Sequence, residues 1–150
     1  MTPEILEYLK GQRVGVFAIE MLDGSPHAAT VHFANTDELV FIFETEKGYR
    51  KTEALVGREI SRASMVVGSN ESEMKTLQLD GTAQLLADEK LKMVYLAKFP
   101  KKQGKLHDPN AVMFMFTPTW WRFTDWTAPE GKIVVTSDGN KTVTPRAKKS

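Results

Sequence analysis

Two adjacent cations, Arg50 and Lys51, are the residues of this sequence best suited to bind a ligand. They follow an apolar segment, Leu39–Glu44, and a short polar turn that contains Gly48. We expect a helix to begin at about Tyr49, and the backbone N–H groups at a helix start attract anions. An arginine fork beside a lysine ammonium strengthens that attraction. The pattern therefore indicates a phosphate-binding corner, with a solvated basic turn as the alternative.

Other kinds of site lack the residues they need. The 150 residues include no cysteine, which excludes disulfides, thiolate metal ligands and thiol nucleophiles. The three histidines, His27, His32 and His107, lack the spacing of a compact metal site. We find neither a serine–histidine triad nor paired carboxylates at hydrolase spacing.

Charge and hydropathy limit the binding partners and the cellular compartment that we expect for this protein. The net charge of +1 predicts no strong attraction to nucleic acid or to anionic membranes. The sequence shows no apolar signal segment at its start and no run long enough to span a bilayer. Together with the lack of cysteine, these features lead us to expect a cytoplasmic protein.

Strand signals dominate the elements that would position the basic pair. Gly81 marks a bulge or bend, and Pro118 requires a break because proline cannot sit in a central ladder. Helices are predicted from a start capped by Thr2 to Gly11, from Tyr49 to Arg58 and from Asp88 to Lys98. Strands are predicted over Val14–Met21, His27–Ala34, Leu39–Glu44, Arg62–Gly68, Met74–Leu86, Ala111–Thr117 and Thr119–Trp126, with Ile133–Thr136 as an optional short addition.

This order of elements predicts a mainly β fold. Six or seven antiparallel strands with two or three peripheral helices favour a small barrel, because closing a sheet protects its edges. We expect one domain over residues 1–136. From Ser137 the chain turns polar and basic, so residues 137–150 are expected to form a flexible tail.

Several segments, in this order along the chain, resemble the pyridoxamine 5'-phosphate oxidase-like family of FMN-binding split barrels. The resemblance covers roughly Ile5 to Trp126 and implies a split-barrel fold. The segments that carry it are Gly24-Ser25-Pro26-His27, Phe43-Glu44-Thr45 with Gly48-Tyr49-Arg50-Lys51, Leu79-Asp80-Gly81-Thr82-Ala83, Phe99-Pro100, and Phe116-Thr117-Pro118 through Phe123-Thr124-Asp125-Trp126.

The resemblance implies an FMN site at the interface of a homodimer. Its phosphate would meet Arg50 and Lys51, and Thr45 would reach the phosphate or the ribityl chain. The other contacts implied are the backbone of Thr30, Val31 and His32 along the ring edge, Thr76 beside the ring, and Trp126, from the partner subunit, packed on it. For His32, on a strand expected to be interior, a core histidine bonded to backbone is the alternative. For Trp126, the alternative is that the ring packs at the core or the dimer contact.

Two departures from the family pattern argue against vitamin B6 oxidation. Ala29-Thr30 stands where the oxidases usually carry an arginine, and no Arg-x-His-Asp-Arg segment follows Trp126. The resemblance then implies a small flavoprotein that passes hydride or electrons between a reduced nicotinamide and a small oxidant. The alternatives are a noncatalytic flavin-binding stress protein, or a split barrel that binds a deazaflavin or haem.

The two acids that flank Thr45 would not tolerate a phosphate beside their carboxylates. Glu44 and Glu46 would repel it, so we expect their side chains to face away or to pair with Lys47 or Arg50.

Overall fold

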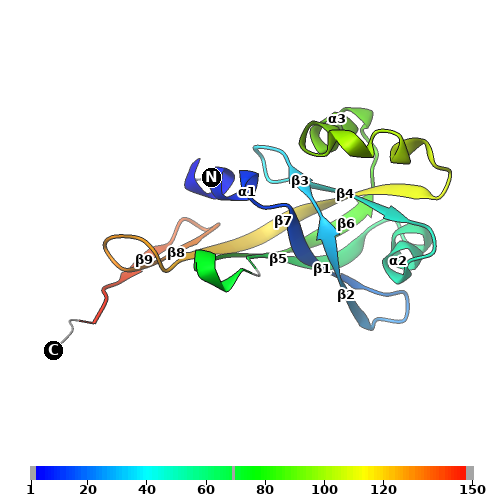
Figure 1. The fold of residues 1–150 in the computed structure, drawn as a ribbon. Coiled ribbons are helices and arrows are strands. Elements are labelled where there is room, and N and C mark those ends of the chain that lie inside the picture. Colours follow the sequence, from blue (N-terminus) through cyan, green and yellow to red (C-terminus); the bar gives the residue numbers. More distant parts are fainter. Residues whose placement is uncertain (1–2, 69, 148–150) are drawn as a thin grey trace.

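A single antiparallel sheet of nine strands organises the part of the chain that the computed structural model describes, residues 3–68 and 70–147 (Figure 1). The strands are β1 Val14–Glu20, β2 Pro26–His32, β3 Ala34–Asn35, β4 Phe41–Glu46, β5 Ser61–Val67, β6 Lys75–Leu85, β7 Ala111–Asp125, β8 Lys132–Thr136 and β9 Lys141–Thr144. Three helices lie around it: α1 Pro3–Lys10, α2 Arg50–Gly57 and α3 Glu89–Lys98. Thr2, the expected cap of the first helix, lies outside the described residues.

Seven of the strands curl into a half-barrel. They are hydrogen-bonded in the order β2-β1-β5-β6-β7-β4-β3, with every pairing antiparallel. The curl brings β2, at one end of this order, into contact with β4 near the other end, although no ladder joins them within the described residues. The prediction of a mainly β split barrel with peripheral helices is confirmed.

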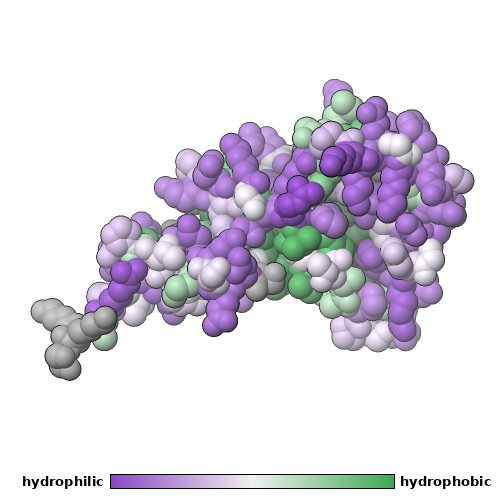
Figure 2. Space-filling view, viewed as in Figure 1, coloured by the Kyte–Doolittle hydropathy of each residue, from purple (hydrophilic) through white to green (hydrophobic). Residues whose placement is uncertain are grey.

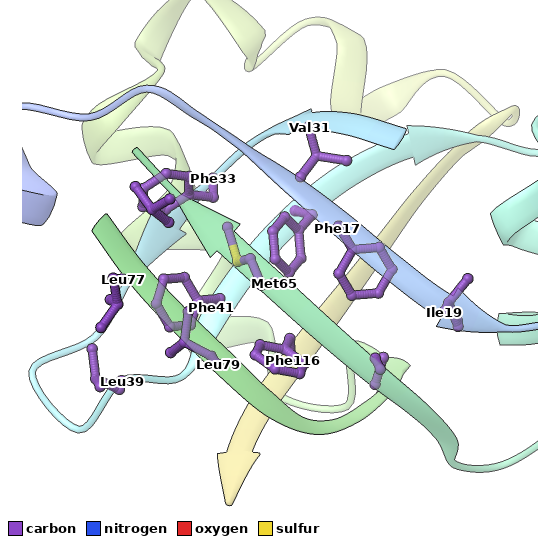
Figure 3. Close-up of a cluster of buried hydrophobic side chains, with 14 of the residues drawn as sticks. Phe17, Ile19, Val31, Phe33, Leu39, Phe41, Met65, Leu77, Leu79 and Phe116 are labelled. Atoms are coloured by element: carbon purple, nitrogen blue, oxygen red, sulfur yellow. The ribbon is translucent and has the colours of Figure 1, made fainter. Parts of the chain in front are cut away.

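The barrel interior is filled by alternate residues of the strands (Figure 3). Phe17 and Ile19 of β1 point inward, as do Phe41 and Phe43 of β4, and all four are at most 2% exposed. Ile42 lies on the opposite face of β4, where α3 covers it with Tyr95 and Phe99 in a second, smaller cluster. Strand β4 is therefore buried on both faces, and its end is a rigid place from which to build a site.

The predicted break at Pro118 is wrong, because β7 runs through this residue without interruption. On one side of β7, the whole length of β6 pairs with residues 114–125. The register of this pairing shifts between Asp80 and Gly81, opposite Pro118. On the other side, β4 pairs with residues 111–116 and β8 with residues 122–125. Pro118 thus sits in the gap between two partner strands, where its missing N–H breaks no ladder.

The expectation of a flexible tail from Ser137 also needs correction. Residues 141–144 form β9, which pairs with β8 across a turn in which Gly139 has a φ of 90°. The chain is fixed again beyond β9, where the Arg146 guanidinium donates to the carbonyls of Trp126, at 3.2 Å, and Ala128, at 3.0 Å. The β-branched residues of Lys141–Thr144 gave a strand signal that their polar setting obscured.

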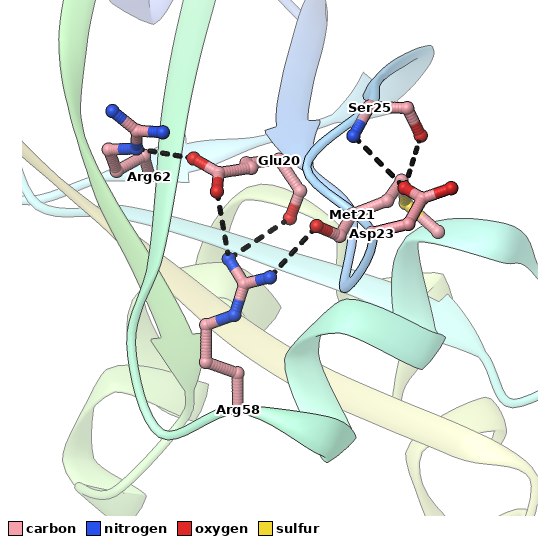
Figure 4. Close-up of polar contacts among 6 residues, drawn as sticks. All are labelled: Glu20, Met21, Asp23, Ser25, Arg58 and Arg62. Carbon is pink, nitrogen blue, oxygen red and sulfur yellow. Dashed lines mark hydrogen bonds and ion pairs between the residues drawn. The ribbon is translucent and has the colours of Figure 1, made fainter.

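Arg58 fastens the far end of α2 to the barrel (Figure 4). Its guanidinium donates to the carbonyl oxygens of Glu20, at 3.4 Å, and Met21, at 2.8 Å, where β1 turns toward β2. The Glu20 carboxylate lies 3.7 Å from the same guanidinium and also pairs with Arg62. These contacts set the position of α2, and with it the position of the basic pair at the start of that helix.

Replacing Arg58 with alanine should lower the free energy of unfolding by about 1–3 kcal/mol, because two hydrogen bonds from a charged donor are lost. Urea denaturation measures this change. Arg62→Ala is the matched control, since Arg62 pairs with the same Glu20 from a side chain that is 84% exposed. Equal losses in the two variants would show that Arg58 has no special role.

Candidate functional site

The corner between β4 and α2 is closed by two hydrogen bonds to one carbonyl. The backbone N–H of Tyr49 donates to the Glu46 carbonyl oxygen at 3.1 Å, and the Thr52 hydroxyl donates to the same oxygen at 2.8 Å. Thr52 is itself buried. The turn is therefore tight, and it fixes the direction in which the first residues of α2 point.

Lys51 is the buried cation of this corner. The residue is 7% exposed, and its ammonium lies 4.7 Å from the centre of the Tyr49 ring. Burial lowers the pKa of Lys51, an effect that the Glu44 carboxylate partly opposes. No carboxylate of residues 3–68 and 70–147 forms an ion pair with it. A bound anion would supply the negative charge that this ammonium lacks.

Two further donors point to the same kind of ligand. The Thr45 hydroxyl is buried and has no hydrogen-bond partner among the described residues. Tyr49, at the N-cap of α2, gives the helix no side-chain cap, so the first turn keeps N–H groups that can meet an oxyanion. Arg50, by contrast, is exposed. The corner thus combines one buried cation, one exposed cation, a hydroxyl and a helix start, a set that fits a phosphate group.

The acids beside Thr45 face the helix α3 and its following loop. Glu44, whose side chain is 4% exposed, lies 3.9 Å from the Lys102 ammonium, and Glu46 lies 3.6 Å from that of Lys105. The expectation that these acids face away is confirmed, because alternation along β4 turns both of them away from Thr45, and the alternative pairing with Lys47 or Arg50 does not occur among the described residues. Lys102 and Lys105 tie the loop after α3 to β4.

Strand β2 places Thr30, Val31 and His32 at the edge of the sheet. Val31 is 6% exposed and packs in the core, so only its backbone can meet a ligand (Figure 3). Thr30 and His32 point outward and are exposed. His32 is thus not on an interior strand, as we had expected, and its ring stands edge-on to Phe99 at 5.5 Å. In the described chain no strand pairs with the outer edge of β2, which leaves backbone groups there for a ligand.

Thr76 and Trp126 lie together at another place in the fold. Thr76 pairs with Thr124 near the end of β7, and Trp126 follows that strand, with its backbone N–H bonded to the Met74 carbonyl at 3.0 Å. Both side chains line a cavity of about 290 Å³. Trp126 is 39% exposed, so much of its indole is free to cover another group.

The predicted site residues therefore fall into two separate groups within one chain. Thr45 pairs with Val112 of β7, whereas Thr76 pairs with Thr124 of the same strand. Twelve residues of strand separate these positions, which is about 40 Å measured along β7. Figure 1 shows α2 and β8 at opposite ends of the sheet. One chain alone does not assemble all eight residues around a single ligand.

Sequence reasoning missed the contacts that Tyr49, Thr52 and Lys102 make. Tyr49 occupies the N-cap, where a serine or threonine would have been read as a cap, and its ring contact with Lys51 has no sequence signal. Thr52 could have been noticed as a hydroxyl in the first turn of a helix. Lys102 contacts Glu44 across 58 positions of sequence, which a single sequence does not reveal.

A comparison with protein families supports the split-barrel fold. Residues 1–125 match the family model described as pyridoxamine 5'-phosphate oxidase. The chain belongs to this family. None of the curated proteins compared with the sequence matches it.

Solved structures of similar fold carry varied descriptions. A Listeria innocua protein provisionally assigned as a pyridoxamine 5'-phosphate oxidase is 26% identical, with 80% of this chain and 94% of that one covered and a TM-score of 0.64. A Clostridium acetobutylicum protein related to general stress protein 26 is 18% identical (90% and 93% covered, TM-score 0.62). A haem-binding protein from Mycobacterium smegmatis is 13% identical, with a TM-score of 0.67, 91% of this chain covered and only 59% of that protein's length. The last two likenesses show the fold alone.

Residues 3–68 and 70–147 contain neither a metal-binding cluster nor a helix that could span a membrane. No three histidine, aspartate or glutamate side chains there lie close enough together to hold a metal ion. Among the helices of the described chain, none has the length and apolar character needed to cross a membrane.

The buried hydroxyl of Tyr95 makes the stability of the protein depend on pH in the alkaline range. Its hydroxyl is buried without a hydrogen-bond partner among the described residues, and burial, with the Glu44 carboxylate, raises its pKa to about 12. An unfolded tyrosine has a pKa of about 10. The native state therefore holds the proton more tightly, and the stability this provides is complete below pH 10 and lost as the pH rises to 12.

Tyr95→Phe should thus be at least as stable as the wild type at pH 7 and should lose about 2–3 kcal/mol less between pH 10 and 12. Urea denaturation across this range measures both effects. Tyr8→Phe is the comparison, because the pKa of Tyr8 is also about 12 but its hydroxyl donates to the Lys75 carbonyl at 3.1 Å. That variant should be less stable at pH 7. A marked loss for Tyr95→Phe at pH 7 would contradict this description of the cluster.

Proposed function

We propose that this protein is a homodimeric FMN-binding flavoprotein that passes hydride or electrons between a reduced nicotinamide and a small oxidant. The observation that carries the proposal is the β4–α2 corner, where a buried ammonium, a buried hydroxyl and an uncapped helix start lie together. Within the described chain, the ammonium has no ion-pair partner and the hydroxyl no hydrogen-bond partner. These groups suit the phosphate of FMN.

Each residue of the corner would make a different contact with that phosphate. Lys51 supplies a fixed positive charge, held in place by the Tyr49 ring. Arg50 is exposed and able to fork two hydrogen bonds onto the oxyanion. Thr45 would donate its hydroxyl to the phosphate or to the ribityl chain. The edge of β2 at Thr30, Val31 and His32 would offer backbone groups to the ring.

A second copy of the chain would complete the site with Thr76 and Trp126. Thr30 lies opposite Val16, Val16 opposite Val66, and Val66 opposite Gln78, so these four residues share the outer face of the sheet. Thr76 is two residues before Gln78 on β6 and therefore lies on the same face. Val16 and Val66 are neighbours on that face and are 40% and 42% exposed. Figure 2 shows apolar surface in this region, over β1 and β5. A partner seated there would cover both valines and bring its own Trp126 to the flavin.

Bound flavin would supply the redox chemistry, accepting hydride from a reduced nicotinamide and passing electrons on. The chain itself would hold and orient the ring and exclude water with Trp126. Hydride transfer depends chiefly on alignment, so the site needs no dedicated acid or base.

Haem binding is the second candidate function. His32 lies at the sheet edge with its ring against Phe99, and partial burial together with the cations Lys102, Arg13 and Lys105 lowers its pKa. A neutral imidazole is the form that binds haem iron. Haem titration of the wild type and of His32→Ala, followed by absorbance, distinguishes this candidate from the flavin proposal.

Replacing Arg50 and Lys51 together with alanine should reduce FMN affinity at least 100-fold, because the phosphate loses both of its cations. Quenching of flavin fluorescence measures the affinity. Lys47→Ala is the matched control, since Lys47 is exposed in the same turn and should leave affinity unchanged. Unchanged affinity in the double variant would reject the phosphate role.

Loss of flavin absorbance on adding NADH or NADPH would then test the oxidoreductase part. Bound FMN that no nicotinamide reduces would favour a noncatalytic flavin binder.

A further inference from the structure

An open cavity of about 710 Å³ lies between the start of α1 and the hairpin that β8 and β9 form. None of the residues that line it belongs to the β4–α2 corner. Figure 1 shows the hairpin extending past the start of α1. The hairpin covers residues 132–144, whereas the family model matches residues 1–125. The cavity therefore depends on a part of the chain that lies outside the family match.

The floor of the cavity is apolar and continues the barrel interior. Phe123 of β7 lies opposite Leu77 of β6 on one side and Val135 of β8 on the other, so these side chains share one face. The residues that form the floor are Trp121, Phe123, Ile133 and Val135. Phe123 is 6% exposed, but the other three are half-buried and keep apolar surface that a ligand could cover.

Hydrogen bonds at both ends of the hairpin hold it in place. The Ser137 hydroxyl accepts from the Trp121 backbone N–H at 3.1 Å, and the Ser137 N–H donates to the Trp121 carbonyl at 3.0 Å. Beyond β9, the Arg146 guanidinium donates to the carbonyls of Trp126 and Ala128. The cavity is thus largely formed without a ligand, as small-molecule sites usually are, and its volume lies within their range of about 300–1,000 Å³.

The charged side chains at the rim of the cavity are mainly acidic. They are Glu4 at the start of α1, Asp125 at the end of β7, Glu130 before β8 and Lys141 at the start of β9. Within residues 3–68 and 70–147, none of the four forms an ion pair. Three carboxylates and one ammonium give the rim a net negative charge, although the whole chain carries +1. This charge attracts a cation.

We propose that this cavity binds a small organic cation, an amine with an apolar body. The floor would bury the body, while the ammonium would meet the rim acids and the face of the Trp121 indole, because indole binds cations better than the other aromatic rings do. A bare metal ion does not suit the cavity, since no three acidic or histidine side chains of the described residues lie close enough together to hold one. A small anion would be repelled by the three carboxylates.

This site does not depend on the proposed flavin site. Thr76 lies opposite Thr124 of β7, and alternation turns Thr124 to the face of that strand away from Trp121 and Phe123. A partner subunit seated on the outer face would therefore leave the cavity accessible. Binding of the amine and binding of FMN can be measured separately.

The indole N–H signals of the three tryptophans, followed by NMR during a titration with 2-phenylethylammonium, test the site. Trp121→Phe identifies the signal of Trp121 by its loss. Two matched probes with a phenyl body are the neutral 2-phenylethanol and the anion 3-phenylpropionate. The amine should shift the Trp121 signal saturably and bind about tenfold more tightly than the alcohol, because only the amine gains the contacts with the acids and the ring.

Equal affinities for the amine and the alcohol, or tighter binding of the anion, would overturn the preference for a cation. No saturable shift of the Trp121 signal with the amine would overturn the site.

Variants of the rim locate the effect of charge. Glu4→Gln/Glu130→Gln should weaken binding of the amine about fivefold and leave binding of the alcohol unchanged, because both acids are exposed at the rim. Glu7→Gln is the matched control, since Glu7 is an exposed acid of the same helix that does not line this cavity. An equal loss in the control, or no loss in the double variant, would contradict the assignment. Arg50→Ala/Lys51→Ala should still bind the amine, so failure of the flavin proposal would leave this result intact.

Discussion

One long strand, β7, sets the geometry on which the rest of the molecule depends. It is the partner of β6 along one side and of β4 and β8 in succession along the other. Because β4 carries the basic corner and β6 carries Thr76, the length of β7 decides how far apart these groups lie. A strand cannot be shortened without breaking its ladders, so no adjustment within one chain brings the two groups together.

This separation gives the proposed dimer a physical reason. The outer face of the sheet carries Thr30 on the edge strand and Thr76 three strands away in the sheet order, with Val16 and Val66 exposed between them. Such a face is suited to contact a second copy of the chain. In that dimer, the Thr76 and Trp126 side chains of one copy would complete the site at the β4–α2 corner of the other. Function and assembly would then depend on the same residues.

The second theme of the structure is a pair of lysines, one buried and one half-buried, that form no ion pair with an acid of residues 3–68 and 70–147. Lys51 at the start of α2 and Lys98 at the end of α3 are both packed against aromatic rings, and burial lowers the pKa of both. Such placements destabilise a protein unless a ligand or solvent compensates them. At the start of α2, this placement supports a site for an anion in a chain whose net charge is only +1.

Local pattern predicted much of the fold. Strand alternation located β1, β4, β5 and β6, and the turn before Arg50 located the corner, because these features depend on neighbours in sequence. Pro118 and β9 were misjudged because both depend on what lies beside them: a gap between two partner strands, and the β8 ladder. The contacts of Lys51 with Tyr49 and of Glu44 with Lys102 were missed because side-chain direction is settled only by packing.

Complementation between two defective variants tests the shared site most directly. Arg50→Ala/Lys51→Ala removes one half of the proposed site, and Thr76→Val/Trp126→Ala removes the other, so each variant alone should bind little FMN. After unfolding and refolding together, mixed dimers regain one intact site, and FMN binding should return to about a quarter of the wild-type level. No recovery in mixed dimers that have formed, or normal FMN binding by Thr76→Val/Trp126→Ala alone, would contradict a site shared between two chains.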